Sequence, residues 1–178
     1  MNKKIIITGG SGSGKDYLMN KMIENGFKSC IKTTTRPIRN GEIQNKTYHF
    51  ITNEEFKNSL DDFLTYESFE VTPKGKPKEI WYYGITKEEF ENCNVAILTT
   101  TEIKKIKKYN YDWVIYYLNI DRDIRKERIM KRKDNNDSIE RRLDADELDF
   151  KDFNCYDKMI KDPNFKVQDI INYDNLCE

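Results

Sequence analysis

Histidine, paired cysteines and long apolar runs are all scarce in this sequence, and each scarcity excludes a class of protein. His49 is the single histidine among 178 residues, so a histidine-based metal cluster is excluded. The four cysteines include no C-x-x-C pair, which argues against a zinc site and favours a reducing compartment. No secretion-signal pattern opens the chain, and no apolar run approaches the roughly 18 residues of a membrane span. We therefore expect a cytoplasmic protein without a membrane partner.

An excess of either charge is also missing. Lysine and arginine together number 31, and aspartate and glutamate together also number 31. A neutral chain has no general attraction to nucleic acid or anionic membranes, so we expect no nucleic-acid partner, and any anion site must be built locally. The apolar fraction is only 37%. The many tyrosines and phenylalanines each bury a large area, however, so one domain can still form a core.

The residues that are present alternate between strand-like and helix-like patterns. Buried strands are predicted at three β-branched runs: Lys4–Thr8, Cys93–Thr100 and Trp113–Ile120. Helices are predicted in the remaining periodic segments. One helix covers Tyr17–Asn25, one begins at Asn53 as its cap, one begins after Thr86, and one lies in the lysine-rich stretch before Trp113. Three more begin after Asp121, at about Ser138 and at Val167, and the last of these ends at Leu176. This alternation predicts an α/β fold with a parallel sheet flanked by helices. The stretch 36–86 is richer in turns and aromatics, which indicates a small inserted subdomain.

A glycine-rich segment lies directly between the first predicted strand and the helix that follows it. Glycines let the backbone wrap so that successive N–H groups point at one anion, while the helix N-terminus and a lysine add positive charge. The first and last glycines and the lysine match the phosphate-loop pattern G-x-x-x-x-G-K. The segment therefore predicts an ATP site over eight consecutive residues: Gly9, Gly10, Ser11, Gly12, Ser13, Gly14, Lys15 and Asp16.

The last of these residues departs from the phosphate-loop pattern. Asp16 stands where a serine or threonine would place a hydroxyl on Mg²⁺, and an aspartate can reach that metal directly or through its water. The predicted central strand ends in Thr99, Thr100 and Thr101, without the carboxylate that P-loop enzymes usually place there. We hypothesise that the metal-binding carboxylate has moved from this strand to Asp16.

Several further segments resemble the guanylate kinase family. These are the run Thr33–Glu42, the triplets Tyr48-His49-Phe50 and Tyr82-Tyr83-Gly84, the pair Arg128 and Arg132, and the run Ile139–Leu143. The resemblance extends over about 4–162. It implies a P-loop NTPase fold in one domain, 1–178, with a core of about 1–35 and 93–178, an acceptor-binding insert of about 36–86 and an arginine lid of about 128–142. It also implies ATP and Mg²⁺ as cofactors and a small phosphorylated substrate, in a monomer or homodimer.

The resemblance assigns roles to arginines and tyrosines on the acceptor side. Arg36, Arg39, Tyr48 and Tyr83 would hold the acceptor's phosphate, and these residue types suit a dianion because arginine offers planar bidentate donors and tyrosine a neutral one.

Three arginines near the predicted lid are assigned to catalysis together with Lys15. Arg128 and Arg132 lie four residues apart on one helical face, and Arg142 follows after a polar loop. Phosphoryl transfer needs positive charge on the transferring oxygens and little covalent chemistry, and a mobile lid that brings arginines to the phosphates meets that need.

Base recognition is where the sequence departs from the family. The family's guanine-reading glutamate falls on Thr65, the serine after its tyrosine motif falls on Ile85, and a serine before the acceptor segment falls on Lys32. Glu67, two residues beyond Thr65, lies on the same strand face and could substitute. The lysine-rich stretch 71–78 is either an exposed hairpin tip or a contact to a second anionic group of the acceptor.

The sequence is therefore compatible with three functions. The first is phosphoryl transfer from ATP to a (deoxy)nucleoside monophosphate with altered base recognition. The second is that of the ribose 1,5-bisphosphate phosphokinases, which this chain resembles in Asp16, in the aliphatic Ile85 and in the carboxylate-free strand end. The third is a non-catalytic guanylate kinase-like module that binds phosphorylated ligands. The intact Gly9, Gly14 and Lys15 favour an enzyme over such a module.

Overall fold

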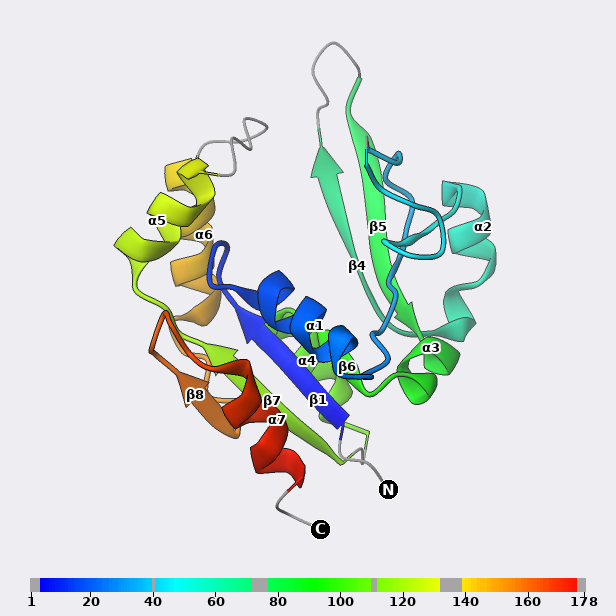
Figure 1. The fold of residues 1–178 in the computed structure, drawn as a ribbon. Coiled ribbons are helices and arrows are strands. Elements are labelled where there is room, and N and C mark those ends of the chain that lie inside the picture. The colour runs from blue at the N-terminus through cyan, green and yellow to red at the C-terminus, as the bar shows by residue number, and fades with distance from the viewer. Residues whose placement is uncertain (1–3, 40, 72–76, 110–111, 132–138, 176–178) are drawn as a thin grey trace. The chain divides into compact units, whose positions relative to one another are not determined.

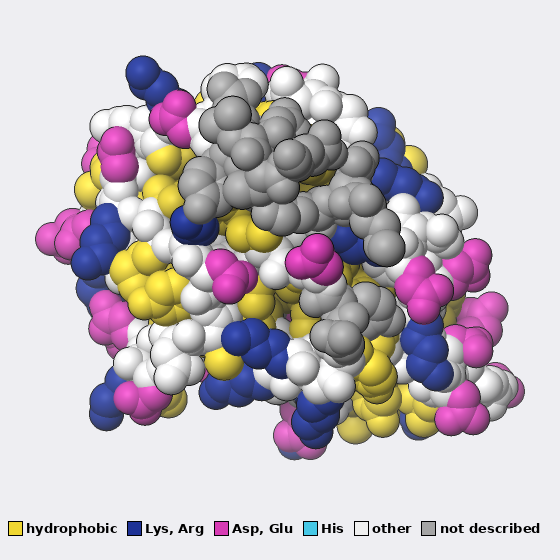
Figure 2. All heavy atoms as spheres, turned by 90° about the horizontal axis from the view of Figure 1, so that it is seen from below, with side chains coloured by type: hydrophobic (Ala, Val, Ile, Leu, Met, Phe, Trp, Pro, Cys, Tyr) yellow, Lys and Arg dark blue, Asp and Glu magenta, His cyan; other side chains and the backbone are white. Residues whose placement is uncertain are grey.

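The computed structural model describes residues 4–39, 41–71, 77–109, 112–131 and 139–175. The chain forms two compact units, of which the first comprises Met1–Ser29 and Asn94–Glu178 and the second comprises Cys30–Cys93. The expected insert, 36–86, falls inside the second unit, and part of the lysine-rich stretch 71–78 lies outside the described residues. Lysine and arginine are interspersed with aspartate and glutamate over the face drawn in Figure 2, as the neutral composition leads one to expect.

A parallel four-stranded sheet forms the centre of the first unit (Figure 1). Its strand order is β6-β1-β7-β8, with bounds β6 Val95–Ile97, β1 Lys4–Gly9, β7 Trp113–Leu118 and β8 Lys158–Ile160. The flanking helices are α1 Lys15–Glu24, α4 Thr100–Ile106, α5 Arg122–Lys131, α6 Ile139–Phe150 and α7 Val167–Asn175. The parallel sheet flanked by helices confirms the predicted α/β class.

Strand β1 is buried because it has a neighbour on each side and helices pack on its side chains. Ile5 and Ile7 lie in one apolar cluster with Leu18 and Met22 of α1, which accounts for the β-branched run at this place in the sequence. On strand β7, Tyr117 stacks on Phe150 of α6 with ring centroids 4.9 Å apart. This stacking fixes the end of α6 against the sheet.

The order of the strands determines where a ligand can bind. The chain passes from β1 to β6 on one side of the sheet and from β7 to β8 on the other, so the direction reverses between β1 and β7. Open α/β sheets bind their ligands outside the carboxyl ends of the strands at such a reversal. Gly9 and Leu118 pair at that end of β1 and β7, and the glycine-rich segment begins there.

The second unit has a mixed four-stranded sheet in the order β3-β2-β5-β4. Its strands are β2 Thr33–Thr34, β3 His49–Phe50, β4 Phe63–Val71 and β5 Glu79–Thr86, and its helices are α2 Asn53–Asn58, the 3-10 turn η1 Leu60–Asp62 and α3 Lys87–Asn92. Phe56 of α2 stacks on Phe63 and on Tyr82, with centroid distances of 4.2 and 5.0 Å. This aromatic core covers one face of the β4–β5 hairpin, and Glu67 and Tyr83 lie on the other face.

Two of the sequence expectations about local structure are wrong. Thr52, not Asn53, caps α2, because Thr52 and Glu55 form a reciprocal capping box. Likewise, the threonines 99–101 do not end a strand: β6 stops at Ile97, and Thr99 caps α4 through the same kind of box with Glu102. Within the described residues, no helix is both long and apolar enough to pass through a lipid bilayer.

Candidate functional site

The segment between β1 and α1 is folded as a loop that only glycine permits at several positions. Gly9, Gly12 and Gly14 have φ angles of +151°, +76° and +103°, a region that residues with a side chain seldom adopt. A Cβ atom on Gly12 would lie 2.6 Å from the carbonyl oxygen of Arg125. The loop therefore needs its glycines for backbone conformation and for close contact with α5.

Lys15 places its ammonium group on the loop itself. Its Nζ donates to the carbonyl oxygens of Gly9 and Gly10, at 2.7 and 2.8 Å. Lys15 also begins helix α1, and Gly14 is the residue that caps this helix. A full positive charge and the N-terminus of a ten-residue helix thus meet at one point, which is the chemistry expected of a phosphate site.

Asp16 and Glu102 are two carboxylates that each lie in the first turn of a helix following a strand of the parallel sheet. Asp16 is exposed in the first turn of α1, and the sequence hypothesis assigns it to Mg²⁺. Mg²⁺ commonly uses one or two carboxylates plus phosphate oxygens and water, so a single aspartate beside a phosphate loop fits this ion. Glu102, which the sequence reading missed, is 1% exposed in the first turn of α4 and accepts the Thr99 N–H at 2.8 Å. No group of three or more possible metal ligands occurs among the described residues.

A cavity of about 570 Å³ adjoins the phosphate loop in the first unit. Arg128 borders this cavity and is held in place by hydrogen bonds to Pro163 O at 2.7 Å and Ser13 O at 3.3 Å. Tyr17 and Phe165, also at its border, meet edge to face with centroids 6.4 Å apart. A guanidinium group with two aromatic rings suits a planar aromatic ligand. The sequence offered no signal for Pro163, Asn164 or Phe165, because these residues lie in a short turn without a motif.

The other two lid arginines are placed differently. Arg142 is half-buried on α6, and Arg132 lies outside the described residues. Arg128 and Arg142 therefore belong to α5 and α6, two helices that are packed against each other in the first unit.

Arg36 of the second unit is held by a carboxylate that the sequence analysis had not singled out. Arg36 is 5% exposed, and its guanidinium makes a bidentate pair with Glu42 at 2.9 and 2.7 Å. It also lies over the rings of Tyr48 and Phe50, at 5.5 and 5.6 Å from their centroids. Hydrogen bonding to Arg36, together with the backbone N–H of Arg39, lowers the pKa of the Glu42 carboxyl. Glu42 thereby fixes the orientation of the arginine.

The remaining acceptor-side residues gather around this pair. Tyr48 contacts Tyr83 edge to face at 6.2 Å, and burial raises the pKa of Tyr48, so its phenol stays protonated and able to donate. Glu67 is paired with Tyr83 across the β4–β5 hairpin, so both side chains lie on the same face of the sheet. Arg39 is exposed, and its backbone N–H donates to Glu42 at 2.7 Å. The second unit thus brings together four of the predicted acceptor side chains, those of Arg36, Tyr48, Tyr83 and Glu67, and Arg39 joins them through its backbone.

Thr65 lies on the same face as Glu67 and has an unusual environment. It is 4% exposed, and its hydroxyl oxygen has no hydrogen-bond partner within the described residues. Ile85, its partner across the hairpin, is fully buried. An unsatisfied buried hydroxyl is unfavourable by about 1–3 kcal/mol, and Thr65 lies on the strand face that also carries Glu67 and Tyr83.

Comparison with known families and proteins shows what this chain is similar to. A family model described as guanylate kinase matches residues 1–172. The chain is 31% identical over 131 residues to a guanylate kinase of Clostridium tetani, a match that covers 72% of this chain and 62% of that protein. It is 37% identical over 92 residues to a guanylate kinase of Wolinella succinogenes, covering 50% of this chain and 39% of the relative. The matched parts therefore span less than two thirds of these relatives.

A solved structure supports the fold independently. The crystal structure of guanylate kinase from Anaplasma phagocytophilum superposes on this chain with a TM-score of 0.65. The superposition covers 98% of this chain and 84% of the Anaplasma chain. The sequence identity is 19%, so this likeness concerns the fold alone.

Proposed function

Because the chain belongs to the guanylate kinase family, we propose that it transfers the γ-phosphate of ATP to the phosphate of a nucleoside monophosphate. The observation that carries this proposal is the phosphate loop at the carboxyl end of β1, with Lys15 bound to its carbonyl oxygens. A phosphorylated acceptor follows from the Arg36–Glu42 pair and the tyrosines around it.

On the donor side, the phosphate loop and Lys15 would bind the triphosphate, and the cavity beside Arg128 would take the adenine. Its aromatic residues, Tyr17 and Phe165, and the Arg128 guanidinium suit a purine. Asp16 is the residue that would hold Mg²⁺, which when bound neutralises charge on the β- and γ-phosphates.

On the acceptor side, Arg36 and Arg39 would bind the monophosphate, and Tyr48 and Tyr83 would donate to its oxygens. Glu42 keeps the Arg36 guanidinium in one orientation, so little entropy is lost when the phosphate binds. The acceptor oxygen is already anionic, and the transfer therefore needs no general base.

The transfer itself is an in-line displacement that depends on alignment and on charge. An acceptor phosphate oxygen forms a bond to the γ-phosphorus while the bond to the β–γ bridging oxygen breaks, which yields ADP and a nucleoside diphosphate. Arg128, Arg132 and Arg142, with Lys15, would neutralise the charge on the transferring group.

Thr65 supports the proposal that this protein accepts a base other than guanine. Guanine presents N–H donors that a carboxylate satisfies, whereas the buried Thr65 hydroxyl can both donate and accept. A site built for guanine loses heavily when such an acceptor is absent. The proposed acceptor is therefore a (deoxy)nucleoside monophosphate whose base offers an acceptor to Thr65, with Glu67 as a second contact.

The proposal is tested by measuring ADP release with all ribo- and deoxynucleoside monophosphates, and with ribose 1,5-bisphosphate as a further acceptor. Turnover of at least one nucleotide, lost in Lys15→Ala, is the expected result. A preference for ribose 1,5-bisphosphate would replace the nucleotide with a sugar phosphate. Absence of all turnover, together with measurable phosphopeptide affinity, would overturn the enzymatic proposal.

The base contact is tested by Thr65→Glu, with Thr65→Ser as the matched control that keeps a hydroxyl. We expect Thr65→Glu to raise kcat/KM for GMP relative to the preferred nucleotide by about tenfold or more, because a carboxylate restores the acceptor that guanine requires. Thr65→Ser should leave the ranking of the acceptors unchanged. An equal change of ranking in both variants would contradict the assignment of Thr65.

A further inference from the structure

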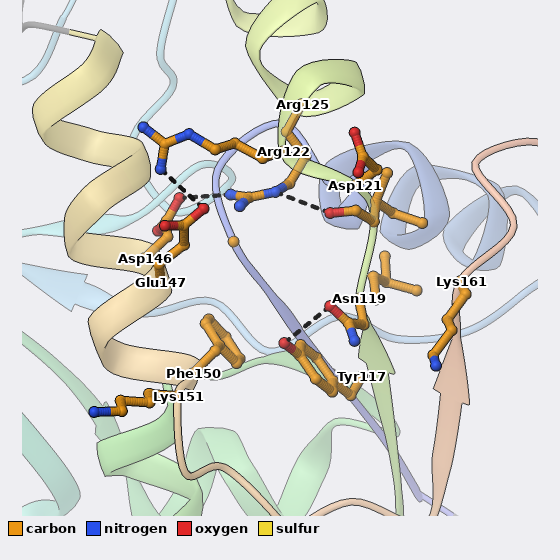
Figure 3. Close-up of a pocket in the computed structure, with 13 residues that line it drawn as sticks. Tyr117, Asn119, Asp121, Arg122, Arg125, Asp146, Glu147, Phe150, Lys151 and Lys161 are labelled. Atoms are coloured by element: carbon orange, nitrogen blue, oxygen red, sulfur yellow. Dashed lines mark hydrogen bonds and ion pairs between the residues drawn. The ribbon is translucent and has the colours of Figure 1, made fainter.

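A buried ion pair joins α5 to α6 beside the phosphate loop (Figure 3). Arg125 of α5 and Asp146 of α6 have side chains that are 8% and 19% exposed, and Nη1 lies 3.1 Å from Oδ2. Arg125 also donates from Nε to the carbonyl oxygen of Ile120, at 3.0 Å. This second bond fixes the guanidinium at the end of β7.

Both side chains of this pair contact the phosphate loop. Asp146 accepts the backbone N–H of Ser11 at 2.7 Å, and Arg125 donates to the carbonyl oxygen of Ser11 at 3.4 Å. The contact is close: a Cβ atom on Gly10 would lie 2.4 Å from Nη1 of Arg125 and 3.1 Å from Asp146. The pair therefore binds the N–H and the C=O of one residue in the middle of the loop.

The charges of the pair suit a place next to an anion site. A carboxylate beside the phosphates would repel them if it were alone, and Arg125 neutralises it while leaving its bond to Ser11 in place. Buried ion pairs contribute little to stability compared with apolar residues of the same size. Global stability is thus a weak reason for this pair, and its hydrogen bonds to the loop are a stronger one.

Asp146 also stands one helical turn after Arg142. Residues four apart lie on the same face of a helix, so the face of α6 that contacts the loop through Asp146 is the face that carries Arg142.

We propose that Arg125 and Asp146 are positioning residues, which hold the phosphate loop in its anion-binding conformation and align α6 so that Arg142 meets the transferring phosphate. This inference rests on the proposed function, because it takes the loop to bind ATP and Arg142 to act on it. The two residues act through Ser11 and through α6, without touching the reacting atoms.

The pair is tested with Asp146→Asn, with the double variant Arg125→Met/Asp146→Leu, and with Arg122→Gln as the matched control. Arg122 joins the same two helices through Glu140, Asp144 and Glu147 at 2.9, 2.7 and 2.9 Å. Its side chain is 30% exposed, and its carboxylate partners are those of α6 rather than groups of the loop. The control therefore loosens the helix pair while leaving Ser11 bound.

The measurements are the Kd for ADP by calorimetry, kcat and KM for ATP, and the midpoint of thermal unfolding. We expect Asp146→Asn to raise both the Kd for ADP and the KM for ATP by about tenfold, because the neutral amide loses the ion pair with Arg125 and accepts the Ser11 N–H only through a weaker, uncharged hydrogen bond. The double variant should recover the unfolding midpoint but not the affinity, because it removes the isolated charge without restoring the bonds to Ser11. In Arg122→Gln the affinity should stay within about twofold, the range expected for exposed ion pairs.

Two results separate failure of this inference from failure of the proposed function. If the unaltered protein does not bind ADP, the proposed function itself is wrong. If it binds ADP and the double variant recovers both the unfolding midpoint and the affinity, the pair has only a structural role and the inference is overturned. Loss of affinity in Arg122→Gln as large as in Asp146→Asn would overturn it as well.

Discussion

At the scale of single residues, two arginines in separate units are each bound by a carboxylate of the same unit. Arg36 pairs with Glu42, and Arg125 pairs with Asp146. Both guanidinium groups are at most 8% exposed, whereas the carboxylates are 18% and 19% exposed. Each guanidinium is therefore fixed in orientation within its own unit, Arg36 by Glu42 and Arg125 by Asp146.

The Arg36–Glu42 pair leads to a prediction about pH. In the folded protein the pKa of the Glu42 carboxyl lies below its ordinary value of 4.5. The Glu42 carboxylate therefore contributes stability that is present above pH 4.5 and is lost as the pH falls through the folded-state pKa. We expect Glu42→Gln to reduce the free energy of unfolding at pH 7 by about 2 kcal/mol, the size of a hydrogen bond to a charged group. The deficit should shrink when the pH falls well below 4.5. Urea denaturation of both proteins at several pH values measures it.

A control for this variant is available in the same unit. Glu70 pairs with Lys78 at 2.6 Å, but both side chains are more than 60% exposed, and exposed pairs contribute about 0–1 kcal/mol. Glu70→Gln should therefore change the stability little at any pH. A pH-independent deficit in Glu42→Gln would show that the ion pair is not its cause.

A second residue-level prediction concerns the metal contact assigned to Asp16, with the buried Glu102 as the comparison. If Asp16 carries the metal contact, Asp16→Asn should raise the Mg²⁺ concentration for half-maximal activity by about tenfold, since a neutral amide is a weaker ligand for Mg²⁺. Glu102→Gln should leave it unchanged, because glutamine also serves in a capping box. Mg²⁺ titrations of the two variants decide between them, and the reverse pattern would assign the metal to Glu102.

At the scale of elements, nucleotide binding by the phosphate loop depends on the conformation of its backbone as much as on its charges. Gly12→Ala should abolish nucleotide binding and reduce stability by about 2–4 kcal/mol, since it combines a left-handed φ with an overlap at 2.6 Å from the Arg125 carbonyl. Gly26 has a φ of +89° with nothing within 4 Å of an added Cβ. Gly26→Ala should therefore cost only about 1–2 kcal/mol and keep ADP affinity. Thermal unfolding and calorimetry of both variants measure the difference; similar ADP affinities would contradict the steric explanation.

Local sequence signals predicted most of the helices and strands. They failed where the secondary structure of a segment depends on its tertiary contacts. The β-branched run of β1 and the cap Asp121, whose carboxylate accepts the N–H of Asp123 at 2.9 Å, are both encoded within a few residues. Strand β8 was not predicted, because its three residues, Lys-Met-Ile, become a strand only through pairing with β7. The cap of α2 was misplaced by one residue because Thr52 and Asn53 are both good caps, and only the bond to Glu55 chooses between them.

The residues of the candidate site likewise fall into those with a local sequence signal and those that only the fold brings together. Lys15 and Arg36 stand in contiguous motifs, so the sequence alone is enough to propose roles for them. Glu42 stood inside such a motif without a role, because the ion pair that gives it one is visible only in the fold. Arg125 and Asp146 could not be found at all, since nothing in the sequence indicates that α5 and α6 meet at Ser11.

At the scale of the whole molecule, the two units carry the two halves of the proposed reaction. The phosphate loop and the cavity beside Arg128 belong to the first unit, and the Arg36–Glu42 pair and Thr65 belong to the second. Each ligand should therefore stabilise its own unit, because binding lowers the population of locally open states where the contacts are made.

Hydrogen exchange measures this division directly. ADP should slow exchange in Gly9–Asp16 and in β1 and β7, and the accepted nucleoside monophosphate should slow it in β2, β5 and residues 36–50. Protection of residues 36–50 by ADP alone, as strong as that of the loop, would contradict the assignment of one ligand to each unit.

The place of the second unit within the chain also matters for how the protein emerges from the ribosome. Cys30–Cys93 is continuous and can complete its sheet as soon as it is synthesised, whereas the first unit is interrupted by it. Strand β1 must wait for both of its neighbours, since Ile5 pairs with Val95 and Lys4 with Trp113. Pairings between distant segments form late and leave apolar strands exposed in the meantime. The phosphate loop is thus synthesised before the second unit, and it can take its final shape only after β6 and β7 have followed.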